Sequence, residues 1–339
     1  MATEPSAKAR AWVIFDRIVA CAAPAGVHSN PWVKSPDGQL RFAPDFDTLA
    51  RLLGVPLHLK AGTQSGVPAL ALDVWLSYEL RRAGFNADQA WPRPVHPRIL
   101  PAPIANLLKA LPIGLRKAVT DRIEKDGAIT GATSSSGIIL GKNYLKQVDV
   151  VISDWVTGPE LLISTKRMDS SYGKNAPNRI EESYGDAKNL RLRHPLAALG
   201  FVFGLRSDIL QKEPATAEWL FDLLAKLGRE DDAYHATCLV LMEYASEGAI
   251  PETGEEPPVT ALPEPGQESE GEDVPAPASD AVVDRDIAQL PRVTILKEEI
   301  PEELAPGRFL AAMVTRVLGA TPVNMHKEAR KRRASPELR

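Results

Sequence analysis

Two apolar segments joined by a short turn constrain the fold of this chain more than any other part of it. Residues 146–154 and 161–166 are rich in valine, isoleucine and leucine, and residues 155–159, Trp-Val-Thr-Gly-Pro, lie between them. β-Branched residues favour strands, and glycine with proline between two such segments is typical of a tight connection. We therefore predict a β-hairpin of two largely buried strands.

Polar residues interrupt both predicted strands. Asp149 projects from the middle of the first, and Ser164 and Lys166 share one face of the second, because side chains alternate along a strand. Burying an acid or a lysine without a partner costs roughly several kcal/mol. The charges therefore need a metal ion, a phosphate group or each other. The first two are typical of a metal-dependent phosphodiesterase site, and a structural ion pair across the hairpin is the alternative.

The hairpin resembles the catalytic hairpin of the PD-(D/E)XK, or restriction-endonuclease-like, nucleases, in which an aspartate on one strand and an acid-x-lysine on the next bind Mg²⁺. Asp149 matches the aspartate and Lys166 the lysine, whereas Ser164 stands in place of the second acid and no proline precedes Asp149. Some restriction enzymes of this superfamily have serine or threonine there and carry the acid on the following helix. Glu181 and Glu182 lie at a comparable distance beyond Lys166, and the resemblance spans roughly residues 70–245.

The resemblance implies a mixed β-sheet flanked by helices and a Mg²⁺-dependent DNA endonuclease, with Mn²⁺ as a second usable ion. It assigns catalysis to Asp149, Lys166 and one of Glu181 and Glu182, with Asp73 assisting, and it makes Asp149 and the glutamates the metal ligands. It also implies restriction or anti-phage defence as the role, and DNA, a second copy of the chain or a defence-complex subunit as partners.

Glu181 and Glu182 cannot both face one site, because adjacent helix residues point about 100° apart. Spacing favours Glu181. We expect the helix to begin at Pro177, so either acid could instead simply complement the helix dipole in the first turn. Glu160 at the start of the second strand is the fallback ligand.

Asp73 is the single charge in the first two turns of an apolar helix predicted over residues 68–84. The resemblance places an acid near the metal at this point, and the alternative is a carboxylate satisfied by Ser77, Arg81 or the backbone. Glu79, beside the arginines at the end of this helix, is predicted to lie at the surface.

Cations follow the hairpin. Lys174 and Arg179 lie in a polar loop that could hold DNA phosphates, and Lys188 and Arg191 continue the positive face along the next helix, with Ser164 beside them. The alternative is an ordinary solvated loop.

The remaining pattern predicts an α/β sandwich. Residues 1–67 form a mainly helical region, and residues 68–246 form the core, with an insert over 94–140 and a flexible connector over 127–137. Further predicted core elements are helices over 103–125, 177–193 and 215–227 and strands over 85–91, 196–205 and 237–244.

The chain carries a net charge of −4, distributed unevenly. Residues 247–286 contain twelve acids and one arginine, so the rest of the chain is at +7, which is compatible with a polyanionic partner. Residues 247–288, acidic and proline-rich, are predicted to be a disordered linker. Residues 289–334 supply a strand over 292–296 and a helix over 306–318 that pack back on the core, and a frayed basic end over 327–333.

Composition narrows the class of protein further. Two cysteines far apart exclude a disulfide framework, and six scattered histidines argue against zinc. The longest apolar stretch near the N-terminus is interrupted by Asp16 and Arg17, which predicts an amphipathic helix and no membrane partner, and the scarcity of cysteine fits a reducing cytoplasm. Two further hypotheses stay open. One is an inactive nuclease fold that binds nucleic acid or a partner subunit, with Ser164 as a sign of lost activity. The other is a scaffold that uses its acidic segment and helical N-terminal region for protein contacts.

Overall fold

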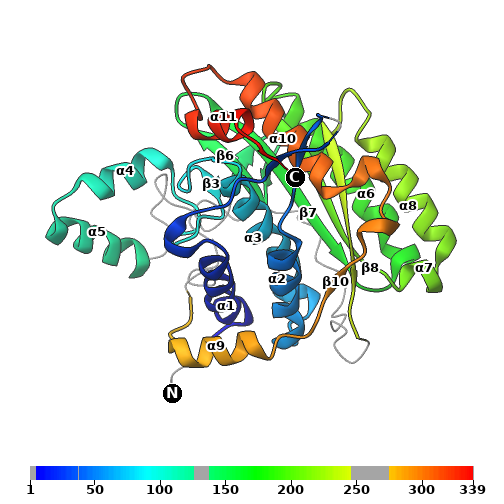
Figure 1. Cartoon of the computed structure of the whole chain (residues 1–339), viewed down its shortest axis with the longest axis horizontal. Helices are drawn as coiled ribbons and strands as arrows, with labels where there is room; N and C mark the ends of the chain where they lie inside the picture. Colours follow the sequence, from blue (N-terminus) through cyan, green and yellow to red (C-terminus); the bar gives the residue numbers. More distant parts are fainter. Residues whose placement is uncertain (1–4, 37, 126–136, 246–274, 339) are drawn as a thin grey trace.

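The computed structural model describes residues 5–36, 38–125, 137–245 and 275–338, so the predicted connector lies almost entirely outside the described residues. A mixed six-stranded sheet forms the centre of the molecule, with helices on both faces (Figure 1), which confirms the predicted α/β class. Its strand order is β10-β9-β8-β7-β6-β3, and the bounds are β3 Ala90–Trp91, β6 Val150–Asp154, β7 Gly158–Met168, β8 Ala198–Arg206, β9 Ala236–Glu243 and β10 Thr294–Ile295.

The predicted hairpin is present as β6 and β7, which pair antiparallel with Val150 opposite Ile163. Gly158 in its turn has a φ of 73°, a conformation that glycine adopts without strain. The first strand is shorter than predicted, because residues 145–147 form β5 (Leu145–Gln147) and pair instead with β4 (Ile138–Leu140). Asp149 therefore lies just before β6 rather than in the middle of a strand.

Strands β7, β8 and β9 are parallel to one another. Parallel neighbours need crossover connections, which α6 (Tyr172–Arg191) provides after β7, and α7 (Ile209–Lys212) with α8 (Pro214–Leu227) after β8. β8 is buried along its whole length, because both faces of the sheet are covered. The prediction of a central strand here is confirmed.

The two faces of the sheet belong to two separate hydrophobic clusters. One cluster joins the sheet to α1 (Ala7–Ala22), α2 (Phe46–His58), α3 (Val67–Arg82) and α10 (Pro306–Ala320), and the other joins it to α6 and α8. The helices of residues 1–67 therefore share one core with α3 and the sheet.

The N-terminal region is less helical than predicted. β1 (Trp32–Lys34) and β2 (Leu40–Phe42) form a hairpin between α1 and α2, and β11 (Glu337–Leu338) pairs parallel to β1. Strands this short carry little periodicity in the sequence, and β11 comes from the opposite end of the chain. Short 3₁₀ turns occupy Pro24–Gly26, Thr63–Ser65, Lys297–Glu299 and Glu302–Leu304.

Three predicted elements in the core have different bounds. The helix over 103–125 is two helices, α4 (Ala102–Ala110) and α5 (Ile113–Lys125), because Leu111 precedes a proline and is extended. They extend from the body of the molecule (Figure 1). The strand over 85–91 is reduced to β3, because the Asn86 side chain accepts a bond from the Asp88 amide and forms a turn. α6 begins at Tyr172, five residues before the predicted start at Pro177.

The acidic segment is not disordered over its whole predicted span. Residues 246–274 lie outside the described residues, whereas α9 (Asp280–Ala288) is a helix beside α1. Asp284 pairs with Arg17 at 2.8 Å, and Val283 is buried. The composition of the segment could not predict these contacts, because they are made with α1, which is distant in the sequence.

The basic C-terminal end is not frayed either. It forms α11 (Lys327–Ala334), in which Arg332 donates hydrogen bonds to the carbonyls of Arg82 at 2.7 Å and His28 at 3.2 Å. Ala329 packs against Gly84 at the end of α3. Carbonyl acceptors supplied by distant segments therefore order this cationic helix.

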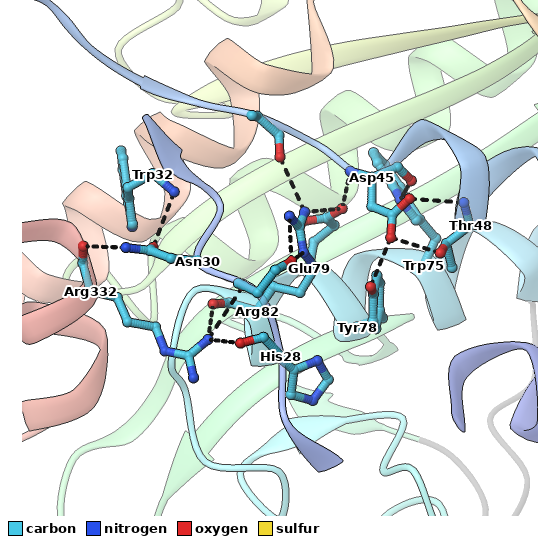
Figure 2. Close-up of polar contacts among 12 residues, drawn as sticks. His28, Asn30, Trp32, Asp45, Thr48, Trp75, Tyr78, Glu79, Arg82 and Arg332 are labelled. Carbon is cyan, nitrogen blue, oxygen red and sulfur yellow. Dashed lines mark hydrogen bonds and ion pairs between the residues drawn. The ribbon is translucent and has the colours of Figure 1, made fainter. Parts of the chain in front are cut away.

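A buried polar network ties α3 to the segment before α2 (Figure 2). Glu79, predicted at the surface, is fully buried, and its carboxylate accepts hydrogen bonds from Arg82 at 2.7 Å and from the Asp45 amide at 2.6 Å. Asp45 in turn accepts bonds from the Tyr78 hydroxyl and the Thr48 amide. Burial raises the pKa of Glu79 to about 7, although Arg82 favours the charged form.

Candidate functional site

Thr165 on β7 holds two carboxylates from different parts of the chain. Its hydroxyl donates to Asp73 Oδ1 on α3 at 2.6 Å, and its backbone N–H donates to Asp149 Oδ2 at 2.7 Å. The register of the hairpin would place Val148 opposite Thr165, so the Asp149 side chain takes the amide that a strand partner would otherwise use. The bond from the Thr165 amide explains why β6 begins only at Val150. The two bonds of Thr165 together bring the predicted acids Asp73 and Asp149 to one place.

Asp73 and Asp149 repel one another as charges. Burial raises the pKa of Asp73 well above its usual range, and the neighbouring Asp149 raises it further, while Lys8 and Lys166 act in the opposite direction. Asp73 is only 8% exposed. Two carboxylates in this position are a pair whose repulsion a divalent cation would relieve.

Lys166 lies on the other face of β7, towards α6. Its Nζ is 3.6 Å from Glu182 Oε1, and its charge also lowers the pKa of Asp73. One ammonium group therefore lies within electrostatic reach of an acid on α3 and an acid on α6. Lys166 is directed into the cluster rather than into open solvent.

Glu182, and not Glu181, faces Lys166. Burial alone would raise the pKa of Glu182, but Lys166, Lys146 and Arg179 outweigh burial and lower it. Glu181 is exposed, so the spacing argument that favoured it is corrected. Because α6 begins at Tyr172, both glutamates lie beyond the first turn, and complementing the helix dipole no longer explains them.

Two further charged residues complete the cluster and were missed from the sequence. Lys146 Nζ is 2.5 Å from Asp186 Oδ2 and 3.5 Å from Glu182 Oε1, and the Tyr144 hydroxyl donates to Asp186 at 3.0 Å. Asp186 follows Glu182 by one helical turn, which was the available signal in the sequence. Lys146 lies on β5, whose pairing with β4 could not be predicted.

Ser164 is buried, and its hydroxyl hydrogen-bonds Tyr234. Burial raises the pKa of Tyr234 well above its usual range, and this phenol donates to the Ser183 carbonyl at 2.8 Å. The hydroxyl of Ser164 is therefore directed into the interior towards Tyr234, whereas the prediction had it on the DNA-facing surface.

The predicted DNA-binding cations separate into two groups along α6. Lys174 is exposed near the start of the helix, and Arg179 lies 3.7 Å from Glu182 Oε2 beside the acidic cluster. Lys188 pairs with Asp232 at 3.0 Å, and Arg191 donates to the Ala233 carbonyl at 3.0 Å. At about 1.5 Å per residue, Lys174 and Lys188 are separated by roughly 21 Å along the helix, so the four cations do not form one patch.

The capacity of the cluster for a metal ion rests on two carboxylates. Across residues 5–36, 38–125, 137–245 and 275–338, no three His, Cys, Asp or Glu side chains are arranged to hold a metal. Glu160, the fallback ligand, is buried elsewhere against His326 at 2.7 Å and is excluded. Mg²⁺ retains several waters and needs only one or two carboxylates, so Asp73 and Asp149 fit it.

Comparisons with known protein families, with curated proteins and with solved structures found no match to this chain. No helix among the described residues has the length and apolar character needed to cross a bilayer. The candidate site is therefore argued from its own geometry.

Proposed function

We propose that this protein is a metal-dependent endodeoxyribonuclease of restriction-endonuclease-like fold. The observation that carries the proposal is the convergence of Asp73, Asp149, Lys166 and Glu182 from four separate elements onto one end of the β6–β7 hairpin. The order of α3, β3, β6, β7, α6 and β8 along the chain supports it, since it agrees with the core that the resemblance implies.

Asp73 and Asp149 are the residues that would hold Mg²⁺ or Mn²⁺. When bound, the ion neutralises phosphate charge and lowers the pKa of a coordinated water. Thr165 presents both carboxylates, through its hydroxyl and its amide, before any ion arrives. A single residue of β7 therefore sets the separation of the two acids.

Lys166 supplies the cation of the reaction. Its ammonium donates hydrogen bonds to the attacking water or to a phosphate oxygen and stabilises negative charge at phosphorus. Glu182, kept ionised by its three cationic neighbours, holds this ammonium in place. Glu182 thus occupies the position on the following helix that the resemblance assigns to the displaced acid, and it acts here through Lys166.

Lys174 and Arg179 would contact the DNA backbone beside the scissile phosphate, because they lie in the half of α6 that borders the cluster. By resemblance, we further propose cleavage of foreign DNA in the cytoplasm as the biological role, with a second copy or a defence-complex subunit as partner.

Plasmid cleavage with Mg²⁺ or Mn²⁺ tests the proposal. The wild type should convert supercoiled plasmid to nicked and linear forms, and EDTA should stop the reaction. Asp149→Asn and Lys166→Met should each reduce the rate at least about 100-fold, which corresponds to roughly 2.7 kcal/mol. Glu181→Gln, next to the site and exposed, is the matched control and should cleave normally. Cleavage by Asp149→Asn and Lys166→Met at the wild-type rate would contradict the proposal.

A second function is favoured by Ser164, which stands in place of the second acid and is buried against Tyr234. In that case the protein binds nucleic acid or a partner subunit without cutting. A wild type that shifts DNA in a gel but leaves plasmid intact across several DNA substrates would select this function.

A further inference from the structure

A cavity of about 420 Å³ lies on another face of α3, away from Asp73. Val74, Ser77 and Arg81 of α3 line it at the i, i+3, i+7 spacing of one helix face, while Asp73 faces β7. The opposite walls come from α1, from residues 23–28 and from the loop over residues 87–95.

Most of the lining is apolar. Trp12, Val19 and Ala23 form the side provided by α1 and its end, and prolines with Val95 form the side provided by the loop. The guanidinium of Arg98 stacks on the Trp12 ring at 3.9 Å and fixes its orientation. A space of this size with rigid apolar walls is typical of small-molecule sites.

Arg81 is the polar group that distinguishes this cavity from a packing defect. It is 5% exposed, and its Nη1 donates a hydrogen bond to the Pro92 carbonyl at 3.1 Å. Among the described residues, its Nε has no partner. Burial and Arg98 lower the pKa of Arg81 to about 10, so it still carries a full charge at neutral pH.

The carboxylate in the cavity lining is already engaged. Asp16 lines the cavity but accepts two hydrogen bonds from Arg98, at 2.9 and 2.7 Å. His28, also in the lining, is neutral at pH 7, because burial and neighbouring arginines lower its pKa to about 4. Its Nδ1 is likewise without a partner in the described part of the structure. Arg93, the other cation in the lining, pairs with Asp88 at 2.7 Å, so Arg81 is the lining cation that has no ion pair with a carboxylate of the described residues.

We propose that this cavity binds a small organic anion, with its carboxylate or phosphate paired to Arg81 and an apolar, ring-sized body against Trp12 and Val74. A guanidinium forms strong charge-assisted bonds to either group. A buried cation left without an anion is costly, and such a ligand removes that cost while filling the apolar space. The inference is independent of the nuclease assignment, because none of these residues belongs to the acidic cluster.

Titration calorimetry of the full chain with three matched compounds tests the proposal: 1-naphthoate, 1-naphthyl phosphate and the neutral 1-naphthamide. At least one anion should bind with 1:1 stoichiometry, and the amide should bind at least about tenfold more weakly. The anion that binds more tightly identifies the headgroup. Equal affinity for the amide and both anions, or no binding of either anion at millimolar concentration, would overturn the proposal.

Two variants locate the binding. Arg81→Met should weaken the anion about 10- to 100-fold and leave the amide unchanged, because a charge-assisted bond is lost without closing the cavity. Ala20→Trp places a large side chain in the cavity from an exposed helix position, and should weaken all three compounds. Arg51→Met, on the exposed face of α2, is the control for loss of one positive charge. Unchanged anion affinity in both Arg81→Met and Ala20→Trp would show that the anion binds elsewhere.

Discussion

Gly84, which ends α3, offers the sharpest test of the packing. Its φ is 102°, and the Phe85 amide bonds back to the Leu80 carbonyl at 3.1 Å, as at many helix C-termini that end with glycine. A Cβ added here would lie 2.7 to 2.9 Å from backbone atoms of Glu328 and Ala329 in α11. Because the obstructing atoms are backbone, no side-chain rotation can relieve the contact.

The loss of unfolding free energy expected for Gly84→Ala is the sum of two terms. Left-handed backbone costs an alanine about 1–2 kcal/mol, and the overpacked contact adds about 1–3 kcal/mol. Unfolding a chain of 339 residues has an entropy near 0.7 kcal/mol/K at about 2.1 cal/mol/K per residue. We therefore expect a total loss of about 2–5 kcal/mol, or a fall in Tm of about 3–7 °C.

Gly66, at the other end of α3, is the matched control. Its φ is 69°, but no atom lies within 4 Å of an added Cβ, so Gly66→Ala carries the backbone cost alone. We expect a fall in Tm of about 1–3 °C for this variant.

Scanning calorimetry and limited trypsinolysis distinguish the two variants. Gly84→Ala should also speed cleavage within Lys327–Ala334, because displacing α11 breaks the bonds from Arg332 to the carbonyls of Arg82 and His28. Equal Tm values for the two variants, with unchanged trypsin sensitivity at α11, would refute the packing of α11 against α3.

Three further outcomes are expected. Glu79 has a pKa of about 7 in the folded state, above its value in the unfolded state, so between these two values the folded state holds a proton that the unfolded state loses. The unfolding free energy of the wild type should therefore fall as pH rises from about 4.5 to 7. Glu79→Gln should lack that slope in urea titrations, and an identical slope would exclude Glu79 as its source. Glu182→Gln should slow plasmid cleavage at least about tenfold by releasing Lys166, and an unchanged rate would remove Glu182 from the site. Glu160→Ala removes the acceptor of the buried hydrogen bond with His326 and should cost about 1–3 kcal/mol in urea unfolding, whereas an unchanged unfolding free energy would exclude a contribution from this contact.

The local sequence pattern was sufficient to predict those helices and strands whose apolar residues recur with a clear period. The β6–β7 hairpin, α3, α8, α10 and the buried strand β8 all have long apolar stretches bounded by glycine or proline, and the structure contains each of them. The hairpin between α1 and α2 escaped prediction because strands of three residues carry almost no periodicity. α9 and α11 escaped it because their charged composition resembles disordered chain, and their partners are distant in sequence.

For the candidate site, the sequence by itself determined which residue types were available: an acid before one strand, a lysine on the next, an acid in α3 and acids on α6. Only the tertiary structure decided that Thr165 holds Asp73 and Asp149 together, that Glu182 rather than Glu181 faces Lys166, and that Lys146 and Asp186 join them. The same holds for the charge of the cavity beside Arg81, which depends on Arg98 engaging Asp16 across 82 residues of chain. The physical reason is that a pattern specifies which face a side chain occupies, whereas the distance between two charges depends on how separate elements pack.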